Sequence, residues 1–149
     1  MVKTDKSWTL FLDRDGVINV EKLDDYILRW EDFIFYNGVK EALALISKLF
    51  SHIIIVTNQR CVGKGMLTEN ELLSIHEKML NEIAEADGKI DRIYFCGDFD
   101  KESINRKPNA GMALQAQQDF PGIDFHKSIM IGNNLSDMEF GKRLGMFTI

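Results

Sequence analysis

Short apolar runs alternate with amphipathic segments along the chain. Three of these runs are almost wholly apolar, as is typical of strands buried on both faces of a parallel sheet. They cover residues 8–12, 52–57 and 128–131. Residues 89–96 and 146–149 predict two further strands. The pattern therefore predicts five short strands spread over the whole chain.

Segments with helical spacing separate these strands. In residues 39–50, apolar side chains recur three and four positions apart and share one face of a predicted helix. Thr68 and Glu71 have the spacing of a capping box, which opens a predicted helix that runs to about residue 87. We expect Gly88 to end it.

Two more helices are predicted in the second half of the chain. Residues 110–118 have a helical pattern, and Pro108 is expected in the first turn of this helix. Ser136 and Glu139 have the spacing of a second capping box, and the helix that they open is expected to end at Gly145.

Strands that alternate with helices predict an α/β fold with a doubly wound, Rossmann-like parallel sheet. We expect residues 1–149 to form a single domain, because a chain of this length can bury a core without a disulfide or a structural metal. In such sheets, ligands bind beyond the carboxyl ends of the strands. The residues that follow the predicted strands are therefore the candidates for function.

Polar and charged side chains follow four of the predicted strands, and the sheet edge is expected to bring them together. They are Asp13 and Asp15 after the first strand, Thr57, Asn58 and Gln59 after the second, Arg106 and Lys107 after the third, and Asn133, Asn134 and Asp137 after the fourth.

Asp13 and Asp15 are one residue apart, and Gly16 permits a sharp turn behind them, so both carboxylates can face one pocket. Paired acids suit a hard divalent cation, or divide the roles of nucleophile and acid–base catalyst. A solvated acidic turn is the alternative for this motif alone.

A phosphate dianion ~4 Å from Asp13 would be repelled by roughly 8 kcal/mol at an effective dielectric constant of about 20. Arg106 and Lys107 supply positive charge, which together with a bound cation can reverse that repulsion and so favour phosphoryl transfer. Taken alone, the two basic residues would fit a solvated loop.

The histidines and cysteines show no metal-binding or catalytic pattern. His52, His76 and His126 are scattered; we place His76 on the surface of its helix and assign none of the three a catalytic role. Cys61 and Cys96 lack a paired spacing, so we expect both to be reduced thiols.

The charge balance restricts the partners. Lys and Arg number 18 against 23 Asp and Glu, and the net charge of -5 argues against non-specific binding to nucleic acid or to an anionic membrane. Residues 1–13 reach an aspartate before any long apolar run forms, which predicts no signal peptide. We expect a cytoplasmic monomer without a nucleic-acid or membrane partner.

Four segments together resemble, in order, the motifs of the haloacid dehalogenase-like (HAD) phosphohydrolases. They are FLDRDGVIN (residues 11–19), VTNQ (56–59), RKPNAGM (106–112) and MIGNNLSDM (130–138). Within this superfamily, the resemblance is greatest to the branch of the D-glycero-D-manno-heptose 1,7-bisphosphate and histidinol-phosphate phosphatases. It covers almost the whole chain and implies a HAD fold without a large cap domain.

The resemblance implies catalytic and metal-binding roles. Asp13 would be the nucleophile that forms an aspartyl-phosphate, and Asp15 would act as general acid and then general base. Mg²⁺ would be held by Asp13, the backbone carbonyl of Asp15 and the side chain of Asn133. The family usually has aspartate where this chain has Asn133, so we expect weaker metal binding, with Asp137 as a supporting acid.

The resemblance also implies contacts with the substrate. Thr57 and Lys107 would bind the transferring phosphoryl group, and Asn58, Gln59 and Arg106 would contact the rest of the substrate.

A second departure from the family concerns zinc. Many relatives carry a zinc loop of Cys and His just before the Arg-Lys-Pro motif. At the matching places this chain has Cys96, Asp98, Ser103 and Asn105, and with a single thiol we expect no zinc there.

The expected function is that of a Mg²⁺-dependent phosphatase, a phosphoric monoester hydrolase that acts on a small phosphorylated metabolite. Heptose 1,7-bisphosphate, cleaved at the 7-phosphate, is the first substrate to expect, and histidinol phosphate is its rival. The alternative from another class is a non-catalytic phosphate-binding protein with a weakened metal site. The retention of Asp13, Asp15, Thr57 and Lys107 argues against that alternative.

Overall fold

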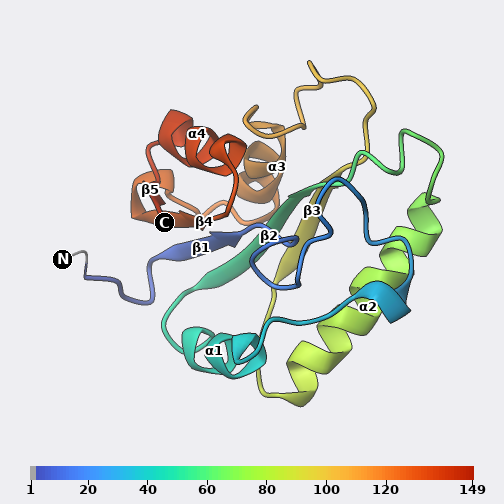
Figure 1. Cartoon of the computed structure of the whole chain (residues 1–149). Coiled ribbons are helices and arrows are strands. Elements are labelled where there is room, and N and C mark those ends of the chain that lie inside the picture. The colour runs from blue at the N-terminus through green and yellow to red at the C-terminus, as the bar shows by residue number, and fades with distance from the viewer. Residues whose placement is uncertain (1–2) are drawn as a thin grey trace.

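The computed structural model describes residues 3–149, so the first two residues of the segment assessed for a signal peptide lie outside the described residues. Within this range the chain forms a five-stranded sheet in which all neighbouring strands are parallel. The strands are β1 Thr9–Leu12, β2 His52–Asn58, β3 Arg92–Cys96, β4 Ser128–Ile131 and β5 Phe147–Thr148. Their order is β3-β2-β1-β4-β5, so the winding reverses at β1, and the predicted doubly wound α/β fold is confirmed (Figure 1).

Helices cover both faces of the sheet (Figure 1). On one face lie α1 Val39–Ile46 and α2 Glu69–Glu85, and on the other lie α3 Gly111–Asp119 and α4 Leu135–Leu144. Short 3₁₀ helices at Trp30–Asp32 and Phe125–Lys127 complete the helical elements of residues 3–149.

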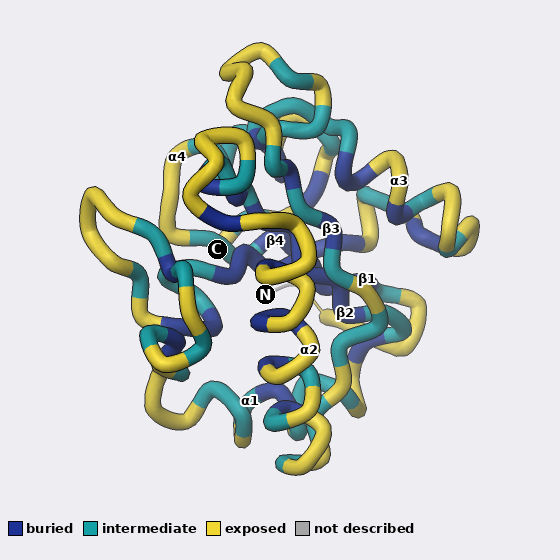
Figure 2. Tube along the Cα trace, turned by 90° about the vertical axis from the view of Figure 1, so that its right-hand side faces the viewer, coloured by how far each residue is buried: buried dark blue, intermediate teal, exposed yellow. Residues whose placement is uncertain are grey.

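Successive residues of β1 divide the core between the two faces. Leu10 and Leu12 pack on the side of α1 and α2, whereas Phe11 packs on the side of α3 and α4. In β2, Ile53 and Ile54 alternate in the same way, and both are fully buried. Burial on both faces explains why these strands are continuous apolar runs in the sequence. Figure 2 shows α2 with buried residues along one side and exposed residues along the other.

The first half of the chain follows the predicted elements closely. Helix α1 ends at Ile46 instead of near residue 50, and there the Ser47 hydroxyl donates a hydrogen bond of 2.6 Å to the carbonyl of Leu43. The capping box of α2 is confirmed, since the Thr68 side chain accepts from the Glu71 N–H and the Glu71 carboxylate accepts from the Thr68 N–H.

The turn after α2 differs from the prediction. The left-handed residue is Asp87, with φ 63°, and not Gly88. Gly88 is needed for space instead, because a Cβ there would lie 2.7 Å from Cγ2 of Ile83. Strand β3 also begins three residues later than expected, at Arg92.

Both helix starts in the second half of the chain need correction. Helix α3 begins at Gly111, so Pro108 precedes it and is not part of its first turn. Helix α4 is capped by Asn134 and Asp137, not by the pair at positions 136 and 139. Its end at Gly145 is confirmed, where φ is 79°.

The segment between β1 and α1 stays close to the sheet. Isolated bridges join Asp15 to Asn19 and Asn19 to Phe35, while Ile27 and Phe33 are buried in the same core as α1 and α2. This agrees with the expected lack of a large cap domain. None of the helices within residues 3–149 is long and apolar enough to cross a bilayer.

Candidate active site

The predicted acids and the predicted lysine meet at the carboxyl edge of the sheet. Asp13 follows β1 directly, and its Oδ1 accepts a hydrogen bond of 2.9 Å from Nζ of Lys107. Lys107 also donates to Oδ1 of Asp137 at 2.6 Å, and all three side chains are buried. They line a cavity of about 100 Å³. The other residues that line it are Asp15, Glu21, Asn58, Asn134 and Ser136.

Burial dominates the electrostatics of Asp13. Desolvation raises the pKa of this carboxyl, Lys107 lowers it, the Asp137 charge raises it, and the pKa lies above its ordinary value. The Lys107 ammonium is therefore the group that favours the ionised form of the buried Asp13 carboxyl. It also balances Asp137, which would otherwise be a second uncompensated buried acid.

The Asp15 carboxylate is held by three side chains. Oδ1 accepts from Nη2 of Arg14 at 2.9 Å and from Nδ2 of Asn19 at 2.9 Å. Oδ2 accepts from Nη2 of Arg14 at 3.0 Å and from Nε2 of Gln59 at 2.8 Å. Burial acts to raise the pKa of Asp15, but the Arg14 charge and these hydrogen bonds outweigh it, so the pKa lies below its ordinary value. The carboxylate is thus fixed in orientation beside Asp13.

Arg14 and His76 are part of this site and were missed in the sequence. Arg14 is fully buried although it lies between the two aspartates, and its Nη1 is 3.1 Å from Nε2 of His76. The prediction that His76 lies on the surface is wrong, since it is 3 % exposed. The signal was available, because His76 shares the helical face of two core residues, Leu72 and Met79.

Asn58 and Thr57 lie where the strand β2 ends, but in different environments. Asn58 holds the backbone of Lys107 at both polar groups: its Oδ1 accepts from the Lys107 N–H at 3.0 Å, and its Nδ2 donates to the Lys107 carbonyl at 3.2 Å. Thr57 is buried, and its hydroxyl accepts a hydrogen bond of 2.9 Å from Nε2 of Gln59. Asn58 therefore positions the lysine as well as lining the cavity.

Gln59 and Arg106 do not lie as the expected substrate contacts. Gln59 is 2 % exposed, and its amide N–H groups are engaged by Asp15 and Thr57, so it orients the Asp15 carboxylate instead. Arg106 does not line the cavity that holds Asp13, and its Nη1 is buried without a hydrogen-bond partner among residues 3–149.

Asn133 lies beside the turn that follows Asp15. Gly16 has φ +88°, and a Cβ at this position would overlap the Asn133 side chain. Nδ2 of Asn133 donates to Oε1 of Glu21 at 2.9 Å, and Glu21 lines the same cavity as Asp13. Glu21 is an acid of this cavity that was missed in the sequence, because it lies in the loop well beyond β1 and not at its end.

Asp137 is not free to support a metal ion as expected. One carboxylate oxygen accepts from Lys107, and the other accepts from the backbone N–H of Asn134 at 3.0 Å. This aspartate serves instead as the capping residue of α4 and as the second partner of Lys107.

The donors expected for Mg²⁺ are all oxygens, as this cation requires: a carboxylate from Asp13, the backbone carbonyl of Asp15 and the amide oxygen of Asn133. Asn133 lies against Gly16, next to Asp15, but it does not line the cavity that holds Asp13, and its Oδ1 accepts a hydrogen bond of 3.0 Å from Nδ2 of Asn134. Within the described part of the chain, no group of three or more His, Cys, Asp and Glu side chains is arranged to hold a metal ion. The expected Mg²⁺ ligands include a single side-chain carboxylate, so they would not form a cluster of three such side chains.

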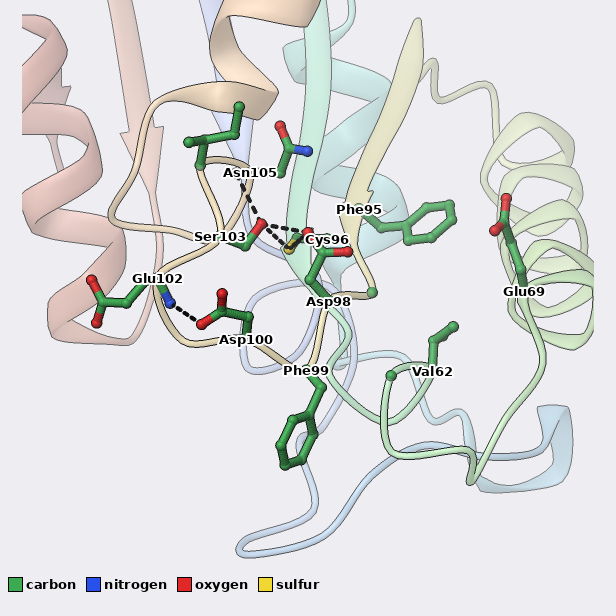
Figure 3. A pocket seen from close by; sticks show the side chains of 13 residues that line it. Val62, Glu69, Phe95, Cys96, Asp98, Phe99, Asp100, Glu102, Ser103 and Asn105 are labelled. Carbon is green, nitrogen blue, oxygen red and sulfur yellow. Dashed lines mark hydrogen bonds between the residues drawn. The ribbon is translucent and has the colours of Figure 1, made fainter.

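The segment after β3, where the sequence predicts no zinc, is held by hydrogen bonds. It lines a larger cavity of about 1050 Å³ beside the end of β3, where Cys96, Asp98 and Ser103 point toward one another (Figure 3). The Cys96 Sγ lies 3.8 Å from Asp98 and 3.7 Å from Ser103, and the Ser103 hydroxyl donates to Asp98. One thiol, one carboxylate and one hydroxyl do not form the set of four Cys or His ligands that is typical of structural zinc.

Comparison with known proteins agrees with this geometry. Residues 8–143 match the model of the family described as polynucleotide kinase 3 phosphatase. The chain belongs to this family, within the HAD phosphatases. It is 40% identical over 144 residues to the D-glycero-alpha-D-manno-heptose-1,7-bisphosphate 7-phosphatase of Campylobacter jejuni, covering 97% of this chain and 81% of that one. The corresponding enzyme of Burkholderia mallei is 37% identical, with 96% and 78% covered.

The fold of this chain is also similar to that of a solved structure. The D,D-heptose 1.7-bisphosphate phosphatase of B. bronchiseptica, complexed with magnesium and phosphate, superposes with a TM-score of 0.87 at 26% identity. The match covers 95% of this chain and 78% of that structure.

Proposed function

We propose that this HAD phosphatase hydrolyses the 7-phosphate of D-glycero-D-manno-heptose 1,7-bisphosphate in a Mg²⁺-dependent reaction. The observation that carries the proposal is the buried Asp13–Lys107–Asp137 cluster, with the oriented Asp15 carboxylate at the same cavity. The similarity to two heptose bisphosphate phosphatases over nearly the whole chain supports the substrate.

The site residues suit a two-step transfer through an aspartyl-phosphate. The pKa of Asp15 is low in the free protein, but the negative charge of a bound phosphate dianion favours the protonated carboxyl. In the first step, Asp13 attacks phosphorus, the bond from phosphorus to the sugar oxygen breaks, and the protonated Asp15 gives its proton to that oxygen. In the second step, Asp15 takes a proton from water as the water oxygen attacks phosphorus, and the Asp13 carboxylate leaves. Lys107 offsets the charge of the phosphoryl group throughout.

Bound Mg²⁺ supplies positive charge to the phosphoryl oxygens, and Asp13, Asp15 and Asn133 are the residues that would hold it. Thr57 completes the proposed phosphoryl contacts. We further propose a cytoplasmic monomer that binds neither zinc nor nucleic acid; the net charge of -5 supports the last point.

Phosphate release from heptose 1,7-bisphosphate, with Mg²⁺ and with EDTA, tests the proposal. We expect turnover that needs Mg²⁺ and is abolished in Asp13→Asn. In contrast, Asp5→Asn, which changes an exposed aspartate before β1, should keep the wild-type rate. Histidinol phosphate, an aryl phosphate and a 3′-phosphorylated oligonucleotide serve as competing substrates. Faster turnover of one of these would replace the proposed substrate, and no turnover of any would favour a phosphate-binding protein.

A further inference from the structure

All three nitrogens of the buried Arg14 guanidinium have partners. Nε lies 3.2 Å from Oδ1 of Asp15, and Nη2 lies 2.9 and 3.0 Å from the two oxygens of that carboxylate. Nη1, on the other edge, faces Nε2 of His76 at 3.1 Å. Arg14 has no exposed surface, so no bulk water is available to replace either partner. The guanidinium therefore joins one group at the cavity to one group on helix α2.

The chemistry of arginine decides which atom of the Arg14–His76 pair donates. A guanidinium carries N–H donors at every nitrogen, offers no acceptor and stays protonated in proteins. Nε2 of His76 must therefore be the acceptor, which places the proton of a neutral ring on Nδ1. Burial, followed by the Arg14 charge, lowers the pKa of His76 to about 3, consistent with a neutral ring near neutral pH.

Asp15 depends on this guanidinium for its orientation. Arg14 contacts both carboxylate oxygens, whereas Asn19 and Gln59 contact one oxygen each. The planar guanidinium holds the carboxylate in one orientation only when the plane of the guanidinium is itself fixed. Nε and Nη2 form the edge of the guanidinium that faces Asp15, and Nη1 lies on the opposite side. A hydrogen-bond partner at Nη1 therefore prevents the guanidinium from rotating away from Asp15.

We infer that His76 is a positioning residue for the acid–base step: its Nε2 accepts from Arg14 and so fixes the guanidinium that orients the Asp15 carboxyl. His76 lies on α2, separated by Arg14 from the reacting atoms, and does not line the cavity that holds Asp13. This inference rests on the proposed function, in which Asp15 transfers the proton. A misplacement of about 1 Å in a reacting group can lower a rate by about 100-fold.

Two variants of similar size separate the acceptor from mere packing. His76→Leu removes the acceptor and leaves a buried Arg14 N–H unpaired, whereas His76→Gln keeps an oxygen that can accept from Nη1. We expect kcat to fall at least about 10-fold in the leucine variant with KM within about twofold, and to recover most of the loss in the glutamine variant. Met79→Leu is the matched control, because Met79 is fully buried on the same face of α2 as His76 and is not among the hydrogen-bond partners of the Arg14 guanidinium.

A measurement on the unchanged protein covers the case in which the leucine variant does not fold. The ¹⁵N chemical shifts of the His76 ring distinguish a protonated from an unprotonated ring nitrogen. We expect a proton on Nδ1 and none on Nε2; a proton on Nε2 would overturn the inference. So would a wild-type kcat in folded His76→Leu, or equal losses in the leucine and glutamine variants.

These outcomes are distinct from failure of the proposed function. If the wild-type protein hydrolyses no phosphate ester, the proposed function fails, whatever the tautomer of His76. If the wild type turns over and the His76 variants match it, the function stands and the positioning role is rejected.

Discussion

Replacing Lys107 by methionine tests the electrostatic core of the site. Lys107 Nζ lies 2.9 Å from Asp13 and 2.6 Å from Asp137, and the Lys107 side chain is 2 % exposed. Methionine has a similar length but no charge, so Lys107→Met leaves two buried carboxylates without a counter-charge. Removing one partner from a buried ion pair costs about 3–5 kcal/mol in the free energy of unfolding. We expect a loss in this range near neutral pH.

The loss in Lys107→Met is expected to depend on pH. Burial already raises the pKa of Asp13 in the wild type, and loss of the ammonium raises the native pKa further above the unfolded value of about 3.9. When the native pKa is above the unfolded one, stability falls as pH rises through the interval between the two values. The deficit relative to wild type is therefore largest above that interval and shrinks on acidification, where the protonated carboxyl needs no counter-charge.

Urea denaturation of both proteins at pH 5 and pH 8 measures this deficit, with Lys40→Met as the matched control. Lys40 pairs with Glu82 at 3.0 Å, but both side chains are more than a third exposed, so the control is expected to lose at most about 1 kcal/mol. A loss in Lys107→Met no larger than in the control, or one that is the same at both pH values, would refute the reasoning. Phosphatase activity should fall by about 100- to 1000-fold in the same variant.

Three further predictions address the other parts of the site. Asn133→Asp adds a carboxylate at the proposed metal site and should tighten Mg²⁺ binding by about tenfold or more, measured by calorimetry; equal affinities would contradict this. Gln59→Leu removes a hydrogen bond to Asp15 and should lower kcat with little change in KM, whereas a change confined to KM would indicate direct substrate contact. Elemental analysis of the purified protein should find zinc far below one atom per chain, and one zinc per chain would contradict the expected absence of a zinc site.

The sequence predicted the strands well because their signal is local. All five strands lie within the predicted runs or one residue beyond them, since burial on both faces makes a strand apolar throughout. Helix boundaries were less certain because several polar residues near α4 can serve as the cap. Asn134 and Ser136 both have an acid three residues later, and the pattern alone does not distinguish them.

The site was predictable to the extent that it lies at strand ends. Asp13 and Asp15 follow β1, and parallel topology brings them to the same edge as Asn58. The contact between Arg14 and His76 joins residues 62 positions apart, and no spacing rule connects a loop arginine to the face of a helix. Gln59 was predicted to contact the substrate for a related reason. The residue type shows that its side chain can donate hydrogen bonds, but it does not show which groups accept them.

The formal charges around the cavity favour a bound cation. Asp13, Asp15, Glu21 and Asp137 contribute four negative charges, while Lys107 and Arg14 contribute two positive charges. The protein part of the site is therefore negative before a phosphate dianion enters, and the proposed divalent cation would restore neutrality. Asparagine at position 133 leaves this balance at zero with the cation bound, whereas aspartate would make it negative again. Weaker metal binding and weaker repulsion of the substrate are thus the two effects that we expect from the same residue.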